Sequence, residues 1–145
     1  MKYKFKQIHT LLEVNDVFQN GKVMSSYSVE KIFRAAWDQI EYKESFWIAL
    51  MDKGGNVIGI EELFKGGVSG CIVDCKCIFQ SALTGNASSI IIAHNHPSGN
   101  LKASGADMAL TRKVAEGAKV LDITLLDHLI LTPSSFLSFA DEGML

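Results

Sequence analysis

Two histidines one residue apart form the part of this sequence best suited to chemistry. His94 and His96 follow a β-branched run, residues 89–93, that is typical of a central strand. Side chains two apart in a strand point to the same side, so the two imidazoles can bind one metal ion. Asp107 comes 11 residues after His96, where a strand–loop–helix connection can bring its carboxylate alongside. Two histidines and one carboxylate leave a fourth position open, which is the donor set of a catalytic zinc.

A zinc ion held in this way lowers the pKa of its bound water to about 7 and polarises a carbonyl group. The same residues also have simpler interpretations. Ser104 and Asp107 have the spacing of a helix capping box, so both could serve only the helix. Residues 97–99 could be only a turn, and an isolated His-x-His is often without a ligand. The combination, directly after a buried strand, favours the metal site.

Hydrophobic periodicity predicts the elements that must position these residues. Apolar steps of three and four after Ser28 predict a helix with Ser28 as its N-cap, and residues 104–118 predict a second long helix. A shorter helical face covers 78–83. Strands are predicted at 2–12, 46–51, 57–61, 89–93, 121–125, 129–132 and 135–140. Because strands and helices interleave, we expect an α/β fold, an α/β/α sandwich with a mixed β-sheet.

Composition limits the class of protein. The 145 residues, of which 48% are hydrophobic, suffice for one domain with a core. The 14 Lys plus Arg against 16 Asp plus Glu argue against a strongly basic nucleic-acid surface. No apolar stretch is long enough for a membrane span, and the N-terminus shows no secretory hydrophobic segment. Three cysteines are too few for a disulfide scaffold, so a cytoplasmic location is expected.

Most of the chain, residues 44–144, resembles the RadC family of JAB/MPN (JAMM-type) domains. The resemblance is carried by residues 44–46, 62–66, 93–99, 126–130 and 138–140. The JAMM pattern of two histidines, a serine eight residues on and an aspartate three later falls on His94, His96, Ser104 and Asp107 without a gap. We therefore expect a RadC-like JAB/MPN domain over residues 28–145, preceded by an N-terminal extension over residues 1–27.

The resemblance implies a cytidine-deaminase-like α/β/α fold and a zinc metallopeptidase-type site with one zinc per chain. It implies a general base outside the ligand set, which points to Glu44, with Glu61 and Glu62 as alternatives. The simpler interpretation of each is a solvated charge at a strand end. The resemblance also implies that Ser104 helps to stabilise a tetrahedral oxyanion.

Two departures from the family weaken its traditional association with DNA repair. RadC proteins usually carry a helix-hairpin-helix DNA-binding domain upstream, for which this sequence has no room. The family's His-Pro-Arg-Glu run before the middle helix is replaced by residues 74–77, Asp-Cys-Lys-Cys. We therefore expect no strong nucleic-acid binding.

Other polar residues have open roles. Asp127 and His128 could support the metal site, act as a second acid–base pair, or form only a hydrogen-bonded strand end. His9 is expected at the surface. The cysteines, which have no fourth ligand at zinc-finger spacing, are expected to be small buried hydrophobes; they are Cys71, Cys75 and Cys77.

The resulting hypothesis is a zinc-dependent JAMM-type metallohydrolase that cleaves a peptide or isopeptide bond in a peptide or protein substrate. The alternative is a RadC-like module associated with DNA repair, whose metal site is structural or acts on nucleic acid. A metal-dependent nuclease is a third possibility, because an activated water can attack more than one kind of electrophile.

Overall fold

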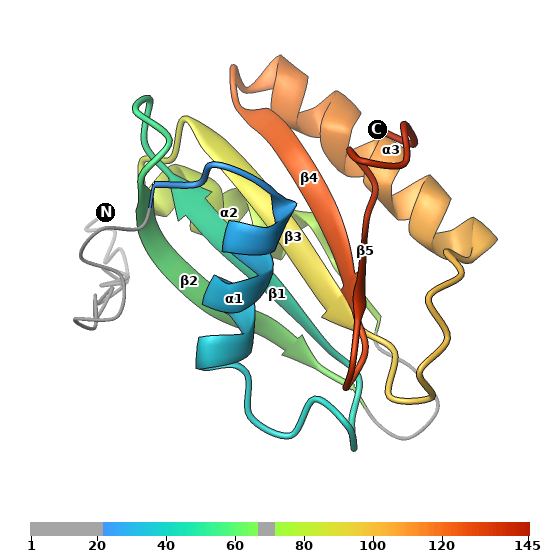
Figure 1. The fold of residues 1–145 in the computed structure, drawn as a ribbon. Coiled ribbons are helices and arrows are strands. Elements are labelled where there is room, and N and C mark those ends of the chain that lie inside the picture. Colours follow the sequence, from blue (N-terminus) through green and yellow to red (C-terminus); the bar gives the residue numbers. More distant parts are fainter. Residues whose placement is uncertain (1–21, 67–71) are drawn as a thin grey trace, which may run out of the picture.

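The computed structural model describes residues 22–66 and 72–145, which form a five-stranded sheet and three helices (Figure 1). The elements are α1 (Ser26–Ala36), β1 (Ser45–Met51), β2 (Val57–Lys65), α2 (Cys75–Thr84), β3 (Ser89–Asn95), α3 (Gly105–Val120), β4 (Thr124–Leu131) and β5 (Phe136–Ser138). The strand expected at 2–12 and most of the expected extension 1–27 lie outside the described residues. No helix within the described ranges is long and apolar enough to cross a membrane.

The sheet is mixed, with the strand order β2-β1-β3-β4-β5. The central strand β3 pairs antiparallel with β1 and parallel with β4, and the antiparallel partners β2 and β5 form the edges. The parallel pair needs a crossover connection, which α3 supplies. The carboxyl end of β3 therefore leads directly into the loop that precedes α3.

Alternating side chains of the central strands build one core on each face of the sheet. Ile48, Leu50 and Ile92 pack against α2 and α3, and Ala49 and Ile91 pack against α1. Figure 1 shows α1 in front of the sheet and α2 behind it. Such continuous apolar runs are typical of strands that are covered on both faces. The expected α/β/α sandwich is confirmed.

The first helix begins earlier than its hydrophobic pattern indicated. Ser25, not Ser28, is the N-cap, and α1 starts at Ser26. Ser28 is the third helical residue, and it forms a capping box with Ser25 in which each side chain bonds the other's backbone. Serines at 25, 26 and 28 all suit a helix start, so the position of the cap depends on this pair of hydrogen bonds.

The two strands expected at 121–125 and 129–132 are one strand, β4. The two expected strands left residues 126–128 between them, but Asp127 and His128 are buried inside β4. The pairing with β3 shifts by one residue beside Leu126, because Ile90 lies opposite Leu125 and Ile91 opposite Asp127. This bulge leaves Leu126 exposed and keeps the hydrophobic residues on both sides of it in the core.

The Asp127 carboxylate connects β4 to the end of the chain. It accepts hydrogen bonds from the Ser138 hydroxyl at 2.6 Å, the Ala140 N–H at 3.0 Å and the His128 N–H at 2.7 Å. Burial raises the pKa of Asp127, and these hydrogen bonds oppose the rise without cancelling it. The carboxylate thus stabilises the edge formed by β5 and the turn after it.

Replacing Asp127 by alanine should lower the free energy of unfolding by about 1–3 kcal/mol, because three donors lose a buried acceptor. The measurement is urea unfolding followed by circular dichroism. Thr124→Ala, an exposed site on the same strand, should change the stability by no more than about 0.5 kcal/mol. Equal effects of the two variants would contradict the role given to Asp127.

Candidate metal centre

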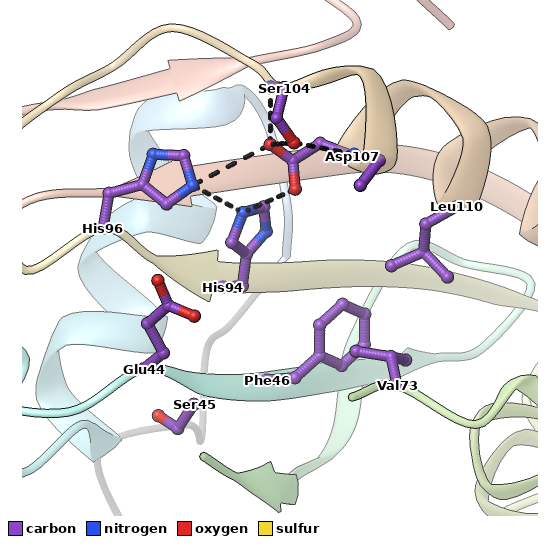
Figure 2. A pocket seen from close by; sticks show the side chains of 10 residues that line it. Glu44, Ser45, Phe46, Val73, His94, His96, Ser104, Asp107 and Leu110 are labelled. Atoms are coloured by element: carbon purple, nitrogen blue, oxygen red, sulfur yellow. Dashed lines mark hydrogen bonds and ion pairs between the residues drawn. The ribbon is translucent and has the colours of Figure 1, made fainter. Parts of the chain in front are cut away.

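The two histidines of the motif lie at the carboxyl end of β3 and point to the same side of the sheet, as expected (Figure 2). Their Nε2 atoms are 3.1 Å apart. The side chains of His94 and His96 are 13% and 17% exposed, so both are shielded but reachable from solvent. The Nδ1 atom of His96 lies 2.7 Å from the Asn100 carbonyl, which can only accept a hydrogen bond, so the proton of a neutral His96 is on Nδ1.

Asp107 approaches the histidines from the first turn of α3. Its Oδ1 lies 3.2 Å from His94 Nε2, and its Oδ2 lies 3.8 Å from His96 Nε2. Ser104 is the N-cap of this helix and forms a capping box with Asp107. Its N–H and its hydroxyl each donate to Asp107 Oδ2 at 2.7 Å. The capping interpretation and the metal interpretation of these two residues therefore hold together in one geometry.

The three side chains have the geometry that a metal ion requires. One donor atom from each of His94, His96 and Asp107 lies within 4.8 Å of the other two. Around a tetrahedral zinc with bonds of about 2.0–2.1 Å, neighbouring donors lie about 3.3–3.4 Å apart. The 3.1 Å between the two Nε2 atoms and the 3.2 Å between His94 Nε2 and Asp107 Oδ1 are close to this value. This is the one such group in the part of the chain that the structure describes. Two imidazoles and a carboxylate fit zinc and leave a coordination position free.

The charge state of Asp107 suits a ligand. Burial would raise the pKa of its carboxyl, but the hydrogen bond and charge of His94 and the hydrogen bonds from Ser104 outweigh burial. Together they hold the pKa of Asp107 well below its ordinary value of 3.8. The carboxylate is therefore ionised at neutral pH, as metal binding requires.

Glu44 lies on the same side of the sheet as His94, His96 and Asp107, which together form the metal group. Phe46 pairs with His94 across the antiparallel strands, so the same register, continued by two residues, sets Glu44 opposite His96. Glu44 lines the cleft, and Figure 2 shows its carboxylate turned toward the histidines. It is not part of the three-residue donor group.

The two alternative glutamates lie elsewhere. Glu61 accepts a hydrogen bond from the Ser81 hydroxyl at 2.5 Å, and Glu62 forms an ion pair with Lys65 at 3.5 Å. Neither lines the cleft that contains the metal group. Of the three glutamates considered from the sequence, the structure brings only Glu44 to this site.

Asn95, between the two histidines, has a role that the sequence analysis missed. It points to the opposite side of β3 and is fully buried. Its amide nitrogen donates to the carbonyls of Ile40 and Lys43, at 2.6 and 2.8 Å, and its oxygen accepts from the Ser45 N–H at 2.7 Å. These bonds hold both sides of Glu44. The sequence did contain a signal for this role. Side chains alternate along a strand, so a polar residue between two metal ligands must face the opposite side of the sheet, where it needs its own hydrogen-bond partners.

His128 lies beneath the metal group, and Asp127 does not. Neighbouring residues of a strand face opposite sides, so only His128 reaches the histidines. It is fully buried inside β4, and its Nε2 lies 2.8 Å from His94 Nδ1. Of the three roles left open for this pair, the strand-end position is wrong, because β4 continues through both residues. Burial lowers the pKa of His128 well below 6.5, and repulsion by a charged His94 acts in the same direction.

The cleft has a volume of about 460 Å³ and two unlike walls. The polar wall carries the metal group, Glu44 and Ser104. The apolar wall consists of Phe46, Val73, Ala106 and Leu110. Cys75 and Cys77 do not line it; both are free thiols in α2, and they are half-buried, whereas buried cysteines were expected. Cys71 and His9, for which a position was also expected, lie outside the described residues.

The α/β/α fold, with two strand histidines and one helix aspartate brought together, is consistent with the JAB-type domain expected from the sequence. The family model described as RadC-like JAB domain matches residues 23–144, and the chain belongs to this family. The resemblance seen in the sequence is thereby confirmed.

Curated relatives carry the name UPF0758 protein, which states no activity. The protein of Flavobacterium johnsoniae is 36% identical over 129 residues, covering 89% of this chain and 56% of the relative. That of Halorhodospira halophila is 35% identical over 147 residues, covering 98% and 66%. That of Porphyromonas gingivalis is 42% identical over 104 residues, covering 71% and 46%. The chain thus spans about half to two thirds of the length of these relatives.

The purified chain should bind one zinc ion, and Asp107→Asn should weaken this binding by more than about tenfold, because a neutral amide replaces the only anionic donor. Isothermal titration calorimetry and elemental analysis measure the affinity and the stoichiometry. Glu116→Gln, an exposed change on the same helix, is the matched control and should bind as the unmodified chain does. Zinc uptake that Asp107→Asn leaves unchanged would contradict this ligand set.

Proposed function

We propose that the chain is a zinc-dependent JAMM-type hydrolase that cleaves a peptide or isopeptide bond. The observation that carries the proposal is the open three-donor group in a cleft with a separate carboxylate, Glu44, turned toward it. A structural zinc normally has four protein ligands, whereas three ligands and a free position are typical of catalysis. A cytoplasmic location fits the free thiols of Cys75 and Cys77.

Each residue has a chemical task in this proposal. His94, His96 and Asp107 hold the metal, which when bound polarises the substrate carbonyl and lowers the pKa of the attacking water. Glu44 takes the proton from that water on its carboxylate and later passes it to the leaving amine. A general base must reach the proton directly or through one water, and the position of Glu44 on the cleft wall supports this role.

Ser104 has a more constrained role. Its hydroxyl proton is directed at Asp107 Oδ2, so in this geometry Ser104 orients a metal ligand. Donation to an oxyanion requires the hydroxyl to rotate away from Asp107, while the Ser104 N–H continues to hold the carboxylate. The proposal assigns both tasks to Ser104, the first at rest and the second during the reaction.

The shape of the cleft supports a peptide as substrate. A peptide bond presents a polar carbonyl beside side chains that are often apolar, and the cleft is lined both by its polar group and by the apolar side chains of Phe46, Val73, Ala106 and Leu110. An apolar side chain next to the bond to be cut matches that wall. The nucleic-acid alternatives lack such support, because a phosphate backbone calls for lysine and arginine, and neither is among the described residues that line the cleft.

Glu44→Gln should retain zinc and lose about 10²–10⁴-fold of the hydrolytic rate, because the amide keeps the size of the carboxylate but cannot accept the proton. The assay incubates the zinc-loaded chain with unstructured peptides and isopeptide-linked conjugates and detects new amino groups by mass spectrometry. Glu41→Gln, an exposed change in the same segment, should cleave normally. Cleavage by Glu44→Gln at the normal rate would exclude Glu44 as the base, and a zinc-loaded chain that cuts nothing would favour a structural metal.

The chain should bind duplex DNA more weakly than about 10⁻⁶ M at physiological salt, because its formal charge of -2 provides few phosphate contacts. Fluorescence anisotropy with a labelled duplex measures the affinity. A tighter complex that weakens steeply with added salt would place the DNA-repair alternative ahead of the hydrolase.

A further inference from the structure

The apolar wall of the cleft forms a pocket beside the metal group. Its side chains come from β1, from the segment before α2 and from the first two turns of α3; they are Phe46, Val73, Ala106 and Leu110. Phe46 is 1% exposed and belongs to the core on this face of the sheet, and Val73 and Leu110 pack against the same core. The core thus holds these side chains from behind, and the pocket exists before any ligand binds.

The surface of this pocket favours an apolar ligand. Val73 and Leu110 are half-buried and line the cleft, so part of their apolar surface faces the space inside it. A ligand group that covers this surface removes it from water, which is favourable in proportion to the area covered. The four side chains of the pocket have no polar atom, so a charged or amide group buried against them loses its hydrogen bonds to water without replacement.

The pocket is closed at its inner end. Ile48, the next residue of β1 on the same face, is fully buried, and so is Ile92, its partner on β3. On this face α2 and α3 cover the sheet. An extended peptide cannot continue along the sheet past this point, so the pocket fits the side chain of one residue and not a length of main chain.

Glu44 and the pocket lie on different sides of His94. Phe46 pairs with His94, and Glu44 precedes Phe46 by two residues, which span about 7 Å of an extended chain. Figure 2 shows the Glu44 carboxylate on one side of the His94 ring, and Phe46, Val73 and Leu110 on the other. A substrate held beside His94 therefore has the base at one of its ends and the apolar pocket at the other.

We infer that this pocket binds the side chain of the residue whose carbonyl group is attacked, and that this side chain is apolar and larger than that of alanine. The inference rests on the hydrolysis proposed above, with Glu44 as its base. Hydrolysis breaks the C–N bond, adds the hydroxyl of water to the carbonyl carbon and gives the proton, through Glu44, to the amine nitrogen. The amine half of the substrate therefore lies on the Glu44 side, and the carbonyl half extends toward the pocket.

This assignment narrows the class of substrate. A glycine that contributes the carbonyl leaves the pocket filled with water only, so bonds that follow glycine are poor substrates. Bonds that follow a residue such as leucine or methionine are good ones. For an isopeptide, the same rule applies to the last residue of the chain that is attached to the lysine.

The first test compares two series of peptides, built on one that the zinc-loaded chain cleaves. One series varies the residue before the cleaved bond among Gly, Ala, Leu and Asp, and the other varies the residue after it. Leucine before the bond should raise kcat/KM at least about tenfold over alanine, because a methylene in an apolar pocket is worth about 10–200-fold. Glycine and aspartate should be poorer still. Equal rates in the first series, or a preference confined to the second, overturn the inference and leave the hydrolase proposal intact.

Variants of α3 change the size of the pocket in opposite directions. Ala106→Leu fills it from an exposed site and should lower the leucine-to-alanine preference about tenfold. Leu110→Ala widens it and should shift the preference from leucine to phenylalanine. Ala109→Leu is the matched control, because Ala109 is exposed on the same helix and does not line the cleft, and it should keep the normal preference. A preference that Ala106→Leu and Leu110→Ala both leave unchanged contradicts the assignment.

The second test requires neither zinc nor hydrolysis. Methyl ¹H–¹³C spectra of leucine- and valine-labelled metal-free protein are recorded with N-acetyl-leucinamide and with N-acetyl-glycinamide, and assigned with Leu110→Ala and Val73→Ile. The leucine compound should shift the methyl signals of Val73 and Leu110, and the glycine compound should not. The methyl signals of Leu126, exposed on β4, should stay in place with both.

Absence of these shifts overturns the pocket, whatever the peptides show. A zinc-loaded chain that cleaves no peptide overturns the proposed function and, with it, the assignment of the pocket to the carbonyl half. The two failures are thus distinguishable, because the first leaves cleavage intact and the second leaves the methyl shifts intact.

Discussion

The alternation of side chains at the carboxyl end of β3 is the constraint on which the site depends. The side chains of three consecutive polar residues there alternate between the two faces of the sheet, so His94 and His96 lie on one face and Asn95 lies on the other. The imidazoles form two thirds of the metal group, and Asn95 holds the segment that carries Glu44 through three hydrogen bonds. A shift of one residue in the pairing of β3 would exchange these roles, and the buried residues on both faces of β3 oppose such a shift.

The start of α3 combines a structural and a chemical task in the same atoms. A helix leaves its first N–H groups unpaired and favours negative charge near them. Asp107 meets both needs through its capping box with Ser104, and the same carboxylate faces the histidines. Because His94 and the cap together keep the carboxylate ionised and the cap holds it in place, the metal group needs little rearrangement to bind an ion, and the entropic cost of binding is lowered.

Buried polar residues hold this domain together away from the apolar cores. Asp127 and His128 are adjacent in β4 but face opposite sides, and each finds its partners on elements far away in the sequence. A buried polar group without a partner costs about 1–3 kcal/mol, so these residues also select the register of β4 against β3. Because of the bulge at Leu126, Asp127 and His128 reach their hydrogen-bond partners while the hydrophobic residues before and after them stay in the core.

Periodicity and spacing in the sequence were sufficient for the α/β/α architecture, the start of α3 at its Ser104 cap, the end of α2 at Gly85, and the grouping of His94, His96 and Asp107. All of these follow from local rules: alternation in a strand, the 3.6-residue helix turn and the offset of a capping box. The continuity of β4, the position of Glu44 rather than Glu61 or Glu62 in the cleft, and the partners of Asn95 and His128 were decided by tertiary structure. They depend on which strand lies beside β3 and in which register, and no local pattern records a hydrogen bond between residues 34 or 50 positions apart.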